Sequence, residues 1–382
     1  MGKAAREQLN RVLSEHLSTV HETLQVLDQT PASSLEKVRW KEVIQIGEHV
    51  SKQATMGLSH SLIIATLFLL FGMLYTGETL EIKALEENMA SYFNTLQGFL
   101  LLSHGSSVGA GPTLLSCIHG SVKQVVDSSF MLLQGAVSSY GSSSNKTQKL
   151  AIPQLVGTVW NACSALKKTP ATNVTAIGRA MTQATVSMKD VLREMMELKP
   201  ASPDSADKAS AHGSTKGKDK SISDVDDDDS FDGELGNDLS PEEMKIVRLT
   251  TSIVSETLAV VKELIRSITG LLQRESAGGD AISVDSLEKL LKLCREAGIQ
   301  IDELGACLYP PQEISAIKVA LEKISSFSDE SETQLRNLKG FTEDFGKACT
   351  GLRSSLRQLE NELGCSNVGD IVPKLENLVV SS

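Results

Sequence analysis

Aromatic residues are scarce in this sequence of 382 residues, of which only 4% are Phe, Trp or Tyr. Sandwiches and barrels rely on aromatic and β-branched side chains, so the shortage argues against an all-β fold. Leu, Ala, Glu, Lys, Gln and Ser are abundant instead, and most of these residues favour helices. No segment shows the sustained polar–apolar alternation of a half-buried strand. The composition therefore predicts an all-α protein.

Closely spaced metal-binding or disulfide-forming residues are also missing. The sequence holds 6 Cys and 7 His, but no Cys-x-x-Cys and no His-Glu-x-x-His. A disulfide framework or a zinc site would need such spacings, so no metal or cofactor is expected. The first seven residues lack the apolar core of a secretory signal. A reducing, intracellular setting is therefore expected.

Positive charge is in deficit, with 37 Lys and Arg against 48 Asp and Glu and a net charge of −11. Such a chain lacks the basic surface that phosphate backbones attract, so direct nucleic-acid binding is not expected. Catalytic patterns are missing as well. The glycine-rich stretch 105–111 has no following Gly-Lys-Ser/Thr, and no nucleophile lies beside a base in any known motif. We expect a protein without enzymatic activity.

An acidic segment divides the chain at residues 201–240. It contains eleven Asp and Glu and four Lys, so it carries −7 of the total charge. Its few large apolar residues cannot offset the entropy of ordering the backbone. The sequence predicts a disordered, Ser/Asp-rich linker at 201–240, between an N-terminal helical domain at 1–200 and a C-terminal helical domain at 241–382.

Serines in and beside this segment are candidate phosphorylation sites. Ser221 and Ser223 each have an Asp three residues downstream, which suits acidophilic kinases, and Ser240 precedes Pro241. A phosphate on Ser240 would lie at a helix N-terminus, where free amides stabilise it. The alternative is that Ser240 is only the N-cap of the helix that Pro241 begins, with Glu243 completing a capping box.

The segment after Pro241 has a heptad pattern of apolar residues. The spacing alternates between three and four residues, which places the side chains on one face of a long helix. This stripe is either the core of a helical bundle or the seam of a coiled-coil dimer. Its principal members are Val247, Val254, Leu258, Val261, Ile265 and Ile268. Similar stripes elsewhere predict two bundle-like halves.

The longest uncharged run of the chain has no Asp, Glu, Lys or Arg between Lys52 and Glu78. Three interpretations are open. The run is a helix buried on all sides, or a membrane span centred on Leu62–Tyr75, since about 20 apolar residues cross a bilayer. In the third, residues 56–71 are an insertion into an otherwise ordinary bundle.

Three short motifs carry a resemblance to a known family. The first is Arg39-Trp40 followed by Ala54-Thr55, and the second is Trp160 with Cys163. The third is the run that ends in Tyr309-Pro310-Pro311. In this order, on both sides of an acidic segment, they resemble the cyclin-D-binding protein family, described as inhibitor-type helix-loop-helix proteins without a basic region. The resemblance implies that residues 56–71 are extra to the family pattern, in which Ala54-Thr55 leads more directly to the stretch at 72–78.

The resemblance implies a fold and a function. It implies helical bundles packed in the manner of vinculin and α-catenin, and binding to a D-type cyclin or a cyclin–kinase complex. It further implies negative regulation of cell-cycle progression, in the cytoplasm and nucleus, with no catalytic residues. Two alternative functions are a helical scaffold tethered to a membrane through 58–75 and a vinculin-like cytoskeletal adaptor. Whether the chain forms homo-oligomers is open.

Overall fold

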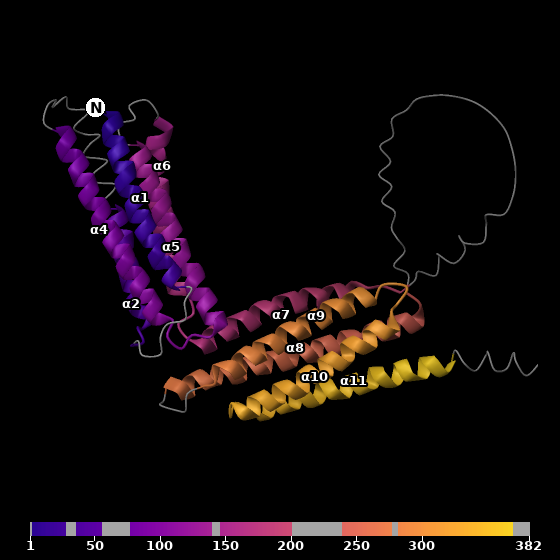
Figure 1. Cartoon of the computed structure of the whole chain (residues 1–382). Coiled ribbons are helices and arrows are strands. Elements are labelled where there is room, and N and C mark those ends of the chain that lie inside the picture. Colours follow the sequence, from indigo (N-terminus) through magenta and orange to yellow (C-terminus); the bar gives the residue numbers. More distant parts are fainter. Residues whose placement is uncertain are drawn as a thin grey trace, which may run out of the picture. The chain divides into compact units, whose positions relative to one another are not determined.

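The computed structural model describes residues 2–27, 36–55, 77–139, 146–200, 239–276 and 282–369. Within these ranges the chain is helical, and its one β-type pairing is an isolated bridge between Pro200 and Leu239. Two compact units are present, Met1–Ile177 and Gly178–Ser382 (Figure 1). The predicted all-α fold with two helical parts is confirmed.

The first unit is a bundle in which α5 packs against α6, α4 packs against α1 and α2, and α2 also packs against α6. Its core is rich in aromatic residues, because Tyr92, Phe93 and Phe99 are almost fully buried in α4. The bounds are α1 Gly2–Leu27, α2 Trp40–Gln53, α4 Gly77–Ser106, α5 Pro112–Ser139, α6 Lys146–Ala165 and the 3₁₀ turn η2 Leu166–Lys168.

The glycine-rich stretch at 105–111 joins α4 to α5. Gly109 has a φ of +74°, a conformation that favours glycine, and Pro112 begins α5. Asn173 fastens this connection, since its Nδ2 donates to Gly109 O over 2.9 Å and its Oδ1 accepts from Gly111 N over 2.8 Å. The stretch is a helix connection and not a phosphate loop.

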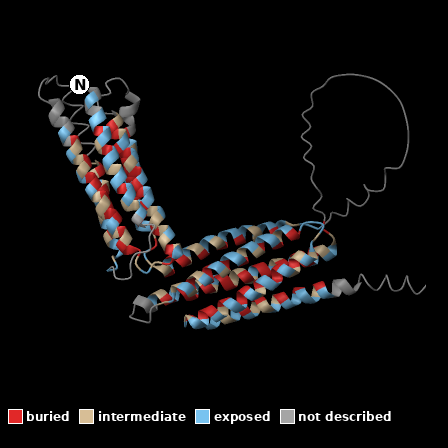
Figure 2. Cartoon of the chain, viewed as in Figure 1, coloured by how far each residue is buried: buried red, intermediate tan, exposed pale blue. Residues whose placement is uncertain are grey.

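The second unit is built on the antiparallel pairs α8–α11 and α9–α10. Its helices bury one side and expose the other, as the colouring of Figure 2 shows. In the predicted stripe of α8, four members are fully buried, while Leu258 and Ile265 lie half-buried at its edge. The bounds are α7 Asn173–Glu197, α8 Pro241–Ser276, α9 Val284–Cys307, α10 Ile314–Asn337 and α11 Glu343–Gly369.

The division between the units differs from the predicted boundary at residue 200. Residues 178–200 group with the second unit, because Met188 and Val191 of α7 contact α9 at Gly298 and Gly305. The sequence prediction followed the change in composition at 201, whereas the packing changes inside α7. The acidic residues 201–238 lie outside the described ranges, and their neighbours Pro200 and Leu239 pair in the second unit.

The uncharged run at 56–76 also lies outside the described residues, so the three interpretations of 56–71 stay predictions. Across the helices that the structure describes, none combines the length and hydropathy needed to span a bilayer.

Candidate functional site

Five of the eight motif residues meet where α2 contacts α6. Trp40, Ala54 and Thr55 belong to α2 and its C-terminal end, and Trp160 and Cys163 belong to α6. At one end of this contact, Trp40 Nε1 donates to Leu166 O over 3.0 Å, and the indole is buried. The first turn of α2 is therefore fixed to η2, about 126 residues away along the chain.

The other end of the contact is held by Trp160. Its Nε1 donates to Thr55 Oγ1 over 2.9 Å and to Ser51 O over 3.3 Å. The polar edge of the indole is therefore anchored, yet 47% of the residue is exposed to solvent. An oriented and exposed tryptophan is typical of protein-binding surfaces, because it offers a large rigid area at little entropic cost.

The rest of this contact depends on a glycine, which lets α2 approach η2 closely, and on a buried thiol of α6. A Cβ on Gly47 would lie 2.5 Å from Leu166 Cδ1, so α2 approaches η2 only because this residue is glycine. Burial raises the pKa of the Cys163 thiol to about 12, although its hydrogen bond to the Ser51 backbone opposes this shift. The thiol is therefore protonated at neutral pH and is a packing group, not a nucleophile.

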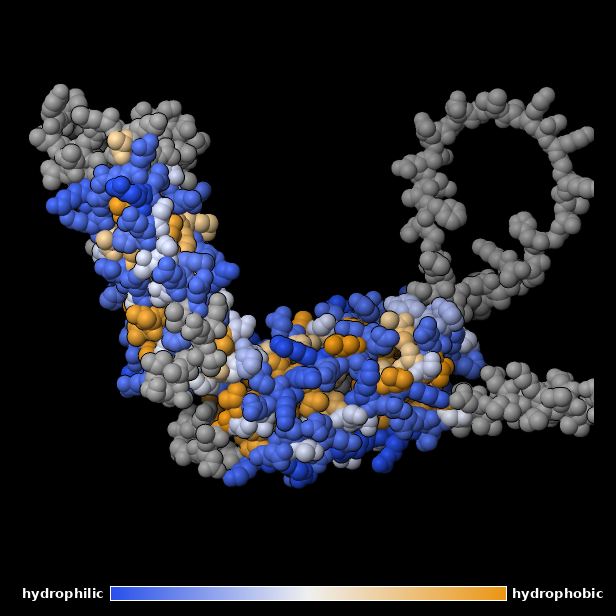
Figure 3. All heavy atoms as spheres, viewed as in Figure 1, coloured by the Kyte–Doolittle hydropathy of each residue, from blue (hydrophilic) through white to orange (hydrophobic). Residues whose placement is uncertain are grey.

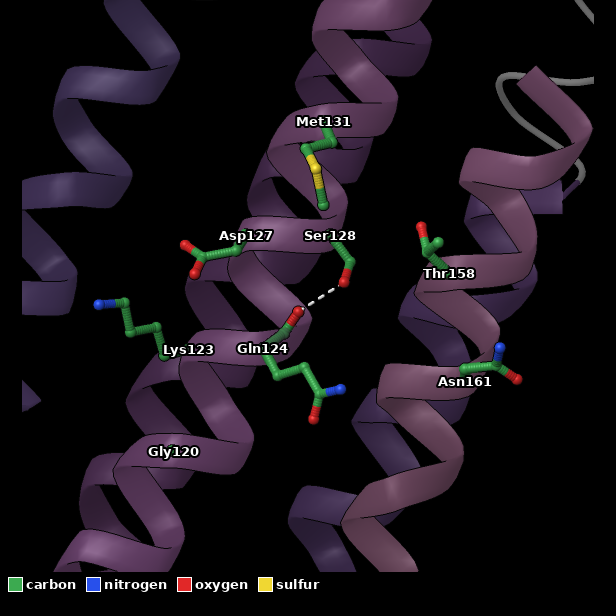
Figure 4. A pocket seen from close by; sticks show the side chains of 8 residues that line it. All are labelled: Gly120, Lys123, Gln124, Asp127, Ser128, Met131, Thr158 and Asn161. Atoms are coloured by element: carbon green, nitrogen blue, oxygen red, sulfur yellow. Dashed lines mark hydrogen bonds between the residues drawn. The ribbon is translucent and has the colours of Figure 1, made fainter. Parts of the chain in front are cut away.

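A shallow groove of about 540 Å³ lies between α5 and α6 (Figure 4). Figure 4 shows Met131, Gln124 and Ser128 of α5 on the side that faces Thr158 and Asn161 of α6. Ser128 Oγ donates to the Gln124 carbonyl within α5, and Met131 is 49% exposed. Amides, hydroxyls and an exposed thioether suit the side chains of a protein partner better than an ion.

Asp127 and Lys123 complete the lining of this groove, but Figure 4 shows them on the other side of α5 from Asn161. Because Lys123 and Asp127 carry opposite charges on neighbouring turns of α5, their electrostatic fields largely cancel in the groove. A salt bridge of 3.0 Å between Lys167 of η2 and Glu48 of α2 joins these two segments. The hydrogen bond and charge of Lys167 lower the pKa of the Glu48 carboxyl, so both groups are ionised at neutral pH.

The third motif lies in the other unit. Tyr309, Pro310 and Pro311 form the turn between α9 and α10, and Tyr309 is exposed. Gln312 Nε2 donates to Leu308 O over 3.2 Å and to Glu243 O over 3.3 Å. This turn is therefore fixed onto the first turn of α8, and its residues support the second bundle.

Ser240 forms the predicted N-cap of α8. Glu243 N donates to Ser240 Oγ over 3.2 Å, and Ser240 N donates to Glu243 Oε2 over 2.8 Å. Leu239 and Met244, on either side of this capping box, are both buried, which is the arrangement of a hydrophobic staple. Phosphorylation of Ser240 stays a prediction, and Ser221 and Ser223 lie outside the described residues.

Metal ligands do not gather in the part of the chain that the structure describes, where no three His, Cys, Asp or Glu residues could hold one ion. The groove itself was not predicted from the sequence. Its lining residues come from one face of α5 and from two positions of α6. Because they are separated along the sequence, no continuous motif identifies the groove.

Comparison with known proteins identifies two matching domain families. The family described as Grap2 and cyclin-D-interacting, N-terminal, matches residues 42–201. The family described as Grap2 and cyclin-D-interacting, C-terminal, matches residues 224–333. The first range contains Trp160 and Cys163, and the second contains Tyr309-Pro310-Pro311.

A curated relative is the Cyclin-D1-binding protein 1 homolog of Xenopus laevis. It is 24% identical over 221 residues, which cover 56% of this chain and 59% of the relative. The matched stretch thus spans about three fifths of the relative's length. Together, the two domain matches and this relative confirm the family resemblance that the three motifs suggested.

Proposed function

Since the chain belongs to the Grap2 and cyclin-D-interacting family, we propose that it is a non-enzymatic protein that binds a D-type cyclin or a cyclin–kinase complex and restrains cell-cycle progression. The observation that carries this proposal is the match of both family domains, in order along the chain, at residues 42–201 and 224–333. The proposed sites of action are the cytoplasm and the nucleus.

We assign the cyclin contact to two features of α6, the exposed ring of Trp160 at the α2–α6 contact and the groove that α6 forms with α5. Trp160 is exposed but held by two hydrogen bonds, so its binding geometry is already organised. The α5–α6 groove is lined by small or flexible side chains, which lets a helix of the partner approach closely. Helix-in-groove binding is a common mode for such a surface.

The first test is direct binding. Purified full-length protein is titrated with each D-type cyclin, alone and with its kinase, and with a cyclin of another class as control. Saturable binding to D-type cyclins is expected, with weaker binding to the control. Failure to bind any D-type cyclin or its kinase complex would contradict the proposal.

The contact surface is tested by Trp160→Ala. Loss of a central tryptophan is expected to weaken binding at least about tenfold. Tyr309→Ala is the matched control, because it removes another exposed aromatic side chain, in the other unit. Trp160→Phe keeps an exposed ring while removing the Nε1 donor, so it separates the ring contact from the anchoring hydrogen bonds. Circular dichroism checks that all variants remain helical.

Restraint of the cell cycle is tested separately from binding. The activity of a cyclin-D-dependent kinase on a purified substrate is measured as this protein is added. A fall in activity with the wild type, and a smaller fall with Trp160→Ala, is expected. Binding that leaves kinase activity unchanged would retain the cyclin contact but contradict the regulatory part of the proposal.

A further inference from the structure

Helix α7 packs in the second unit mainly through methionine. The chain has 10 Met, and three of them, Met181, Met188 and Met195, are buried in α7 at intervals of seven residues. Methionine is unbranched and polarizable, so it adapts to surfaces of different shape. The contact of α7 therefore requires a less exact fit to the opposite surface than a contact made by Leu, Ile and Val would.

The surface that receives α7 carries two glycines of α9, also seven residues apart. A Cβ on Gly298 would lie 3.2 Å from Met188 Cε, and a Cβ on Gly305 would lie 2.8 Å from Val191 Cγ1. Glycine within a helix is destabilising relative to alanine, so a helix retains it at a cost in stability. These two glycines form a shallow track on α9 in which another helix lies.

This track is independent of the packing of α9 with the other helices. Apart from α9 itself, the atoms within 4 Å of the Cβ positions at Gly298 and Gly305 belong, among the described residues, to Met188 and Val191. A Cβ at either position would therefore press on α7 and on no other neighbouring helix. The track is a separate helix-binding surface on α9.

Polar contacts fasten other helix pairs of this unit more firmly. Lys245 pairs with Glu362 between α8 and α11, and Arg353 of α11 binds Asp329 and Glu332 of α10. On α7, Thr182 donates to Gly178 O and Arg193 donates to Asp190, both within the helix. Asn173 at the start of α7 bonds to the α4–α5 connection in the first unit. The adaptable apolar contact is thus the characteristic attachment of α7.

Apolar side chains also remain exposed along the same two helices. Met196 of α7 is 70% exposed and Ile299, next to Gly298 on α9, is 61% exposed. Figure 3 shows hydrophobic side chains scattered among hydrophilic ones on the visible face of this unit. A helix that replaced α7 could cover Ile299 as well as the glycine track.

We propose that α7 is a displaceable cover. The track of Gly298 and Gly305 on α9 binds an amphipathic helix of a protein partner with methionine or leucine at seven-residue intervals, and α7 occupies the track until that helix competes for it. The pairing of Pro200 with Leu239 tethers the end of α7 beside the unit, so a displaced α7 returns readily. The proposal holds whichever protein supplies the helix, and it does not depend on cyclin binding.

The first experiment blocks the track in the full-length protein with Gly305→Leu. The matched control is Gly270→Leu on α8, where glycine is exposed and a Cβ has no atom within 4 Å among the described residues. Hydrogen exchange is followed by mass spectrometry. Amides of residues 178–197 are expected to exchange at least about tenfold faster in Gly305→Leu, with α8–α11 still protected. The control should leave both regions unchanged.

Two outcomes of this experiment would overturn the proposal. Unchanged protection of α7 in Gly305→Leu would show that α7 does not depend on the track. Loss of protection across α8–α11 together with α7 would show that α7 is an integral part of the bundle and cannot leave alone.

The second experiment supplies a competing helix. The probe is a fluorescent peptide of residues 178–197, and its binding is measured by anisotropy. The receptor is the full-length protein with Met188→Glu and Val191→Glu, which uncovers the track. This receptor is expected to bind the peptide at least about tenfold more tightly than the wild type, in which α7 competes from within the chain. Adding Gly305→Leu should abolish binding, and a folded, uncovered receptor that binds no peptide would contradict the proposal.

A reversible disulfide between α7 and α9 provides a test that does not require the double-glutamate receptor to fold. Val191→Cys with Gly305→Cys places two thiols at the contact, where Val191 Cγ1 lies 2.8 Å from the Cβ position of residue 305. The native Cys307 lies two residues from position 305, and burial raises the pKa of its thiol, so it competes poorly for oxidation. The peptide should bind the reduced protein and not the oxidised one, and equal binding to both would contradict displacement.

Discussion

The cores of the two units are built from different side chains. In the first unit, Tyr92, Phe93 and Phe99 fill the interior of α4, and Tyr92 Oη donates to Ser129 Oγ over 2.9 Å. In the second unit, Leu, Ile and Val are interrupted by fully buried hydroxyl groups of α8 and α10. Four of these are Thr250, Thr257, Ser328 and Ser331.

This difference concerns how well each interior satisfies its polar groups. Burial raises the pKa of Tyr92, which keeps its hydroxyl neutral and able to donate its hydrogen bond. In the second unit, Thr250 Oγ1 and Ser331 Oγ are buried with no hydrogen-bond partner among the described residues. An unpaired buried hydroxyl costs about 1–3 kcal/mol. The first unit also has unpartnered buried atoms, which include Gln53 Oε1 and His104 Nδ1, but among the described residues the unpaired hydroxyls lie in the second. Removing a large ring should therefore destabilise the first unit, and removing an unpaired hydroxyl should stabilise the second.

The largest expected effect is in the aromatic core. Phe99→Ala should lower the free energy of unfolding of the first unit by about 3–5 kcal/mol, because it leaves a cavity among buried rings. Leu101→Ala is the control, since Leu101 lies on the same helix and is 63% exposed. Chemical denaturation followed by circular dichroism measures both. If both variants lose the same free energy of unfolding, the aromatic core does not have the proposed stabilising role.

The next effect concerns the ion pairs of the second unit and depends on pH. Hydrogen bonds from Arg353 and then Arg336 lower the pKa of the Glu332 carboxyl below its ordinary value of 4.5. Since the folded state favours the ionised form, the pair stabilises the unit above that value and loses this contribution as the pH falls through the lowered pKa. Glu332→Gln should cost about 1.5 kcal/mol at pH 7.

Urea unfolding at several pH values checks this prediction. The difference between wild type and Glu332→Gln should be constant from pH 7 to pH 5 and should shrink below the ordinary pKa of 4.5. Glu343→Gln is the control, because Glu343 pairs with Lys347 at an exposed site. A difference that stays constant into the acid range would exclude an ionic contribution from Glu332.

A gain in stability is expected where the second core is polar. Thr250→Val removes the unpaired hydroxyl with little change in volume, so it should raise the stability of the second unit by about 1 kcal/mol. Thr269→Val on the same helix is the control, because Thr269 is exposed and donates to Ile265 O. Thermal melting compares the two. If Thr250→Val destabilises the unit, the hydroxyl has a structural role.

The smallest effect is at the start of α8. Ser240→Ala removes the acceptor for Glu243 N and should cost about 0.5–1 kcal/mol, whereas Ser240→Asp should retain most of the stability because Asp also caps helices. Thermal unfolding measures the cap. Similar losses for both variants would show that the capping box contributes little to the second unit.

Helix content could be predicted from local pattern, but partners could not. The stripe from Val247 placed α8 correctly, yet Leu258 and Ile265 lie at the edge of its buried face. A heptad spacing drifts from the 3.6-residue turn over a helix of 36 residues, so the core moves around the surface of α8. The Ser240 cap was predictable because it involves neighbours in sequence.

The candidate site shows the same limit. Trp40 and Trp160 could be recognised as motif residues, but their hydrogen bonds reach Leu166 and Thr55 across long stretches of chain. The groove between α5 and α6 needs both helices together, and the glycine track of α9 needs α7. Glycine spacing within α9 does not reveal which helix it receives.

The sequence by itself determined the secondary structure and the family, because helix propensity, caps and apolar spacing act over a few residues. It also located the acidic segment through composition. The tertiary structure decided that residues 178–200 pack with the second unit, that Trp160 is anchored yet exposed, and that α7 lies on the glycines of α9. These features depend on close packing between distant segments, where a methyl group more or less changes which helices can touch.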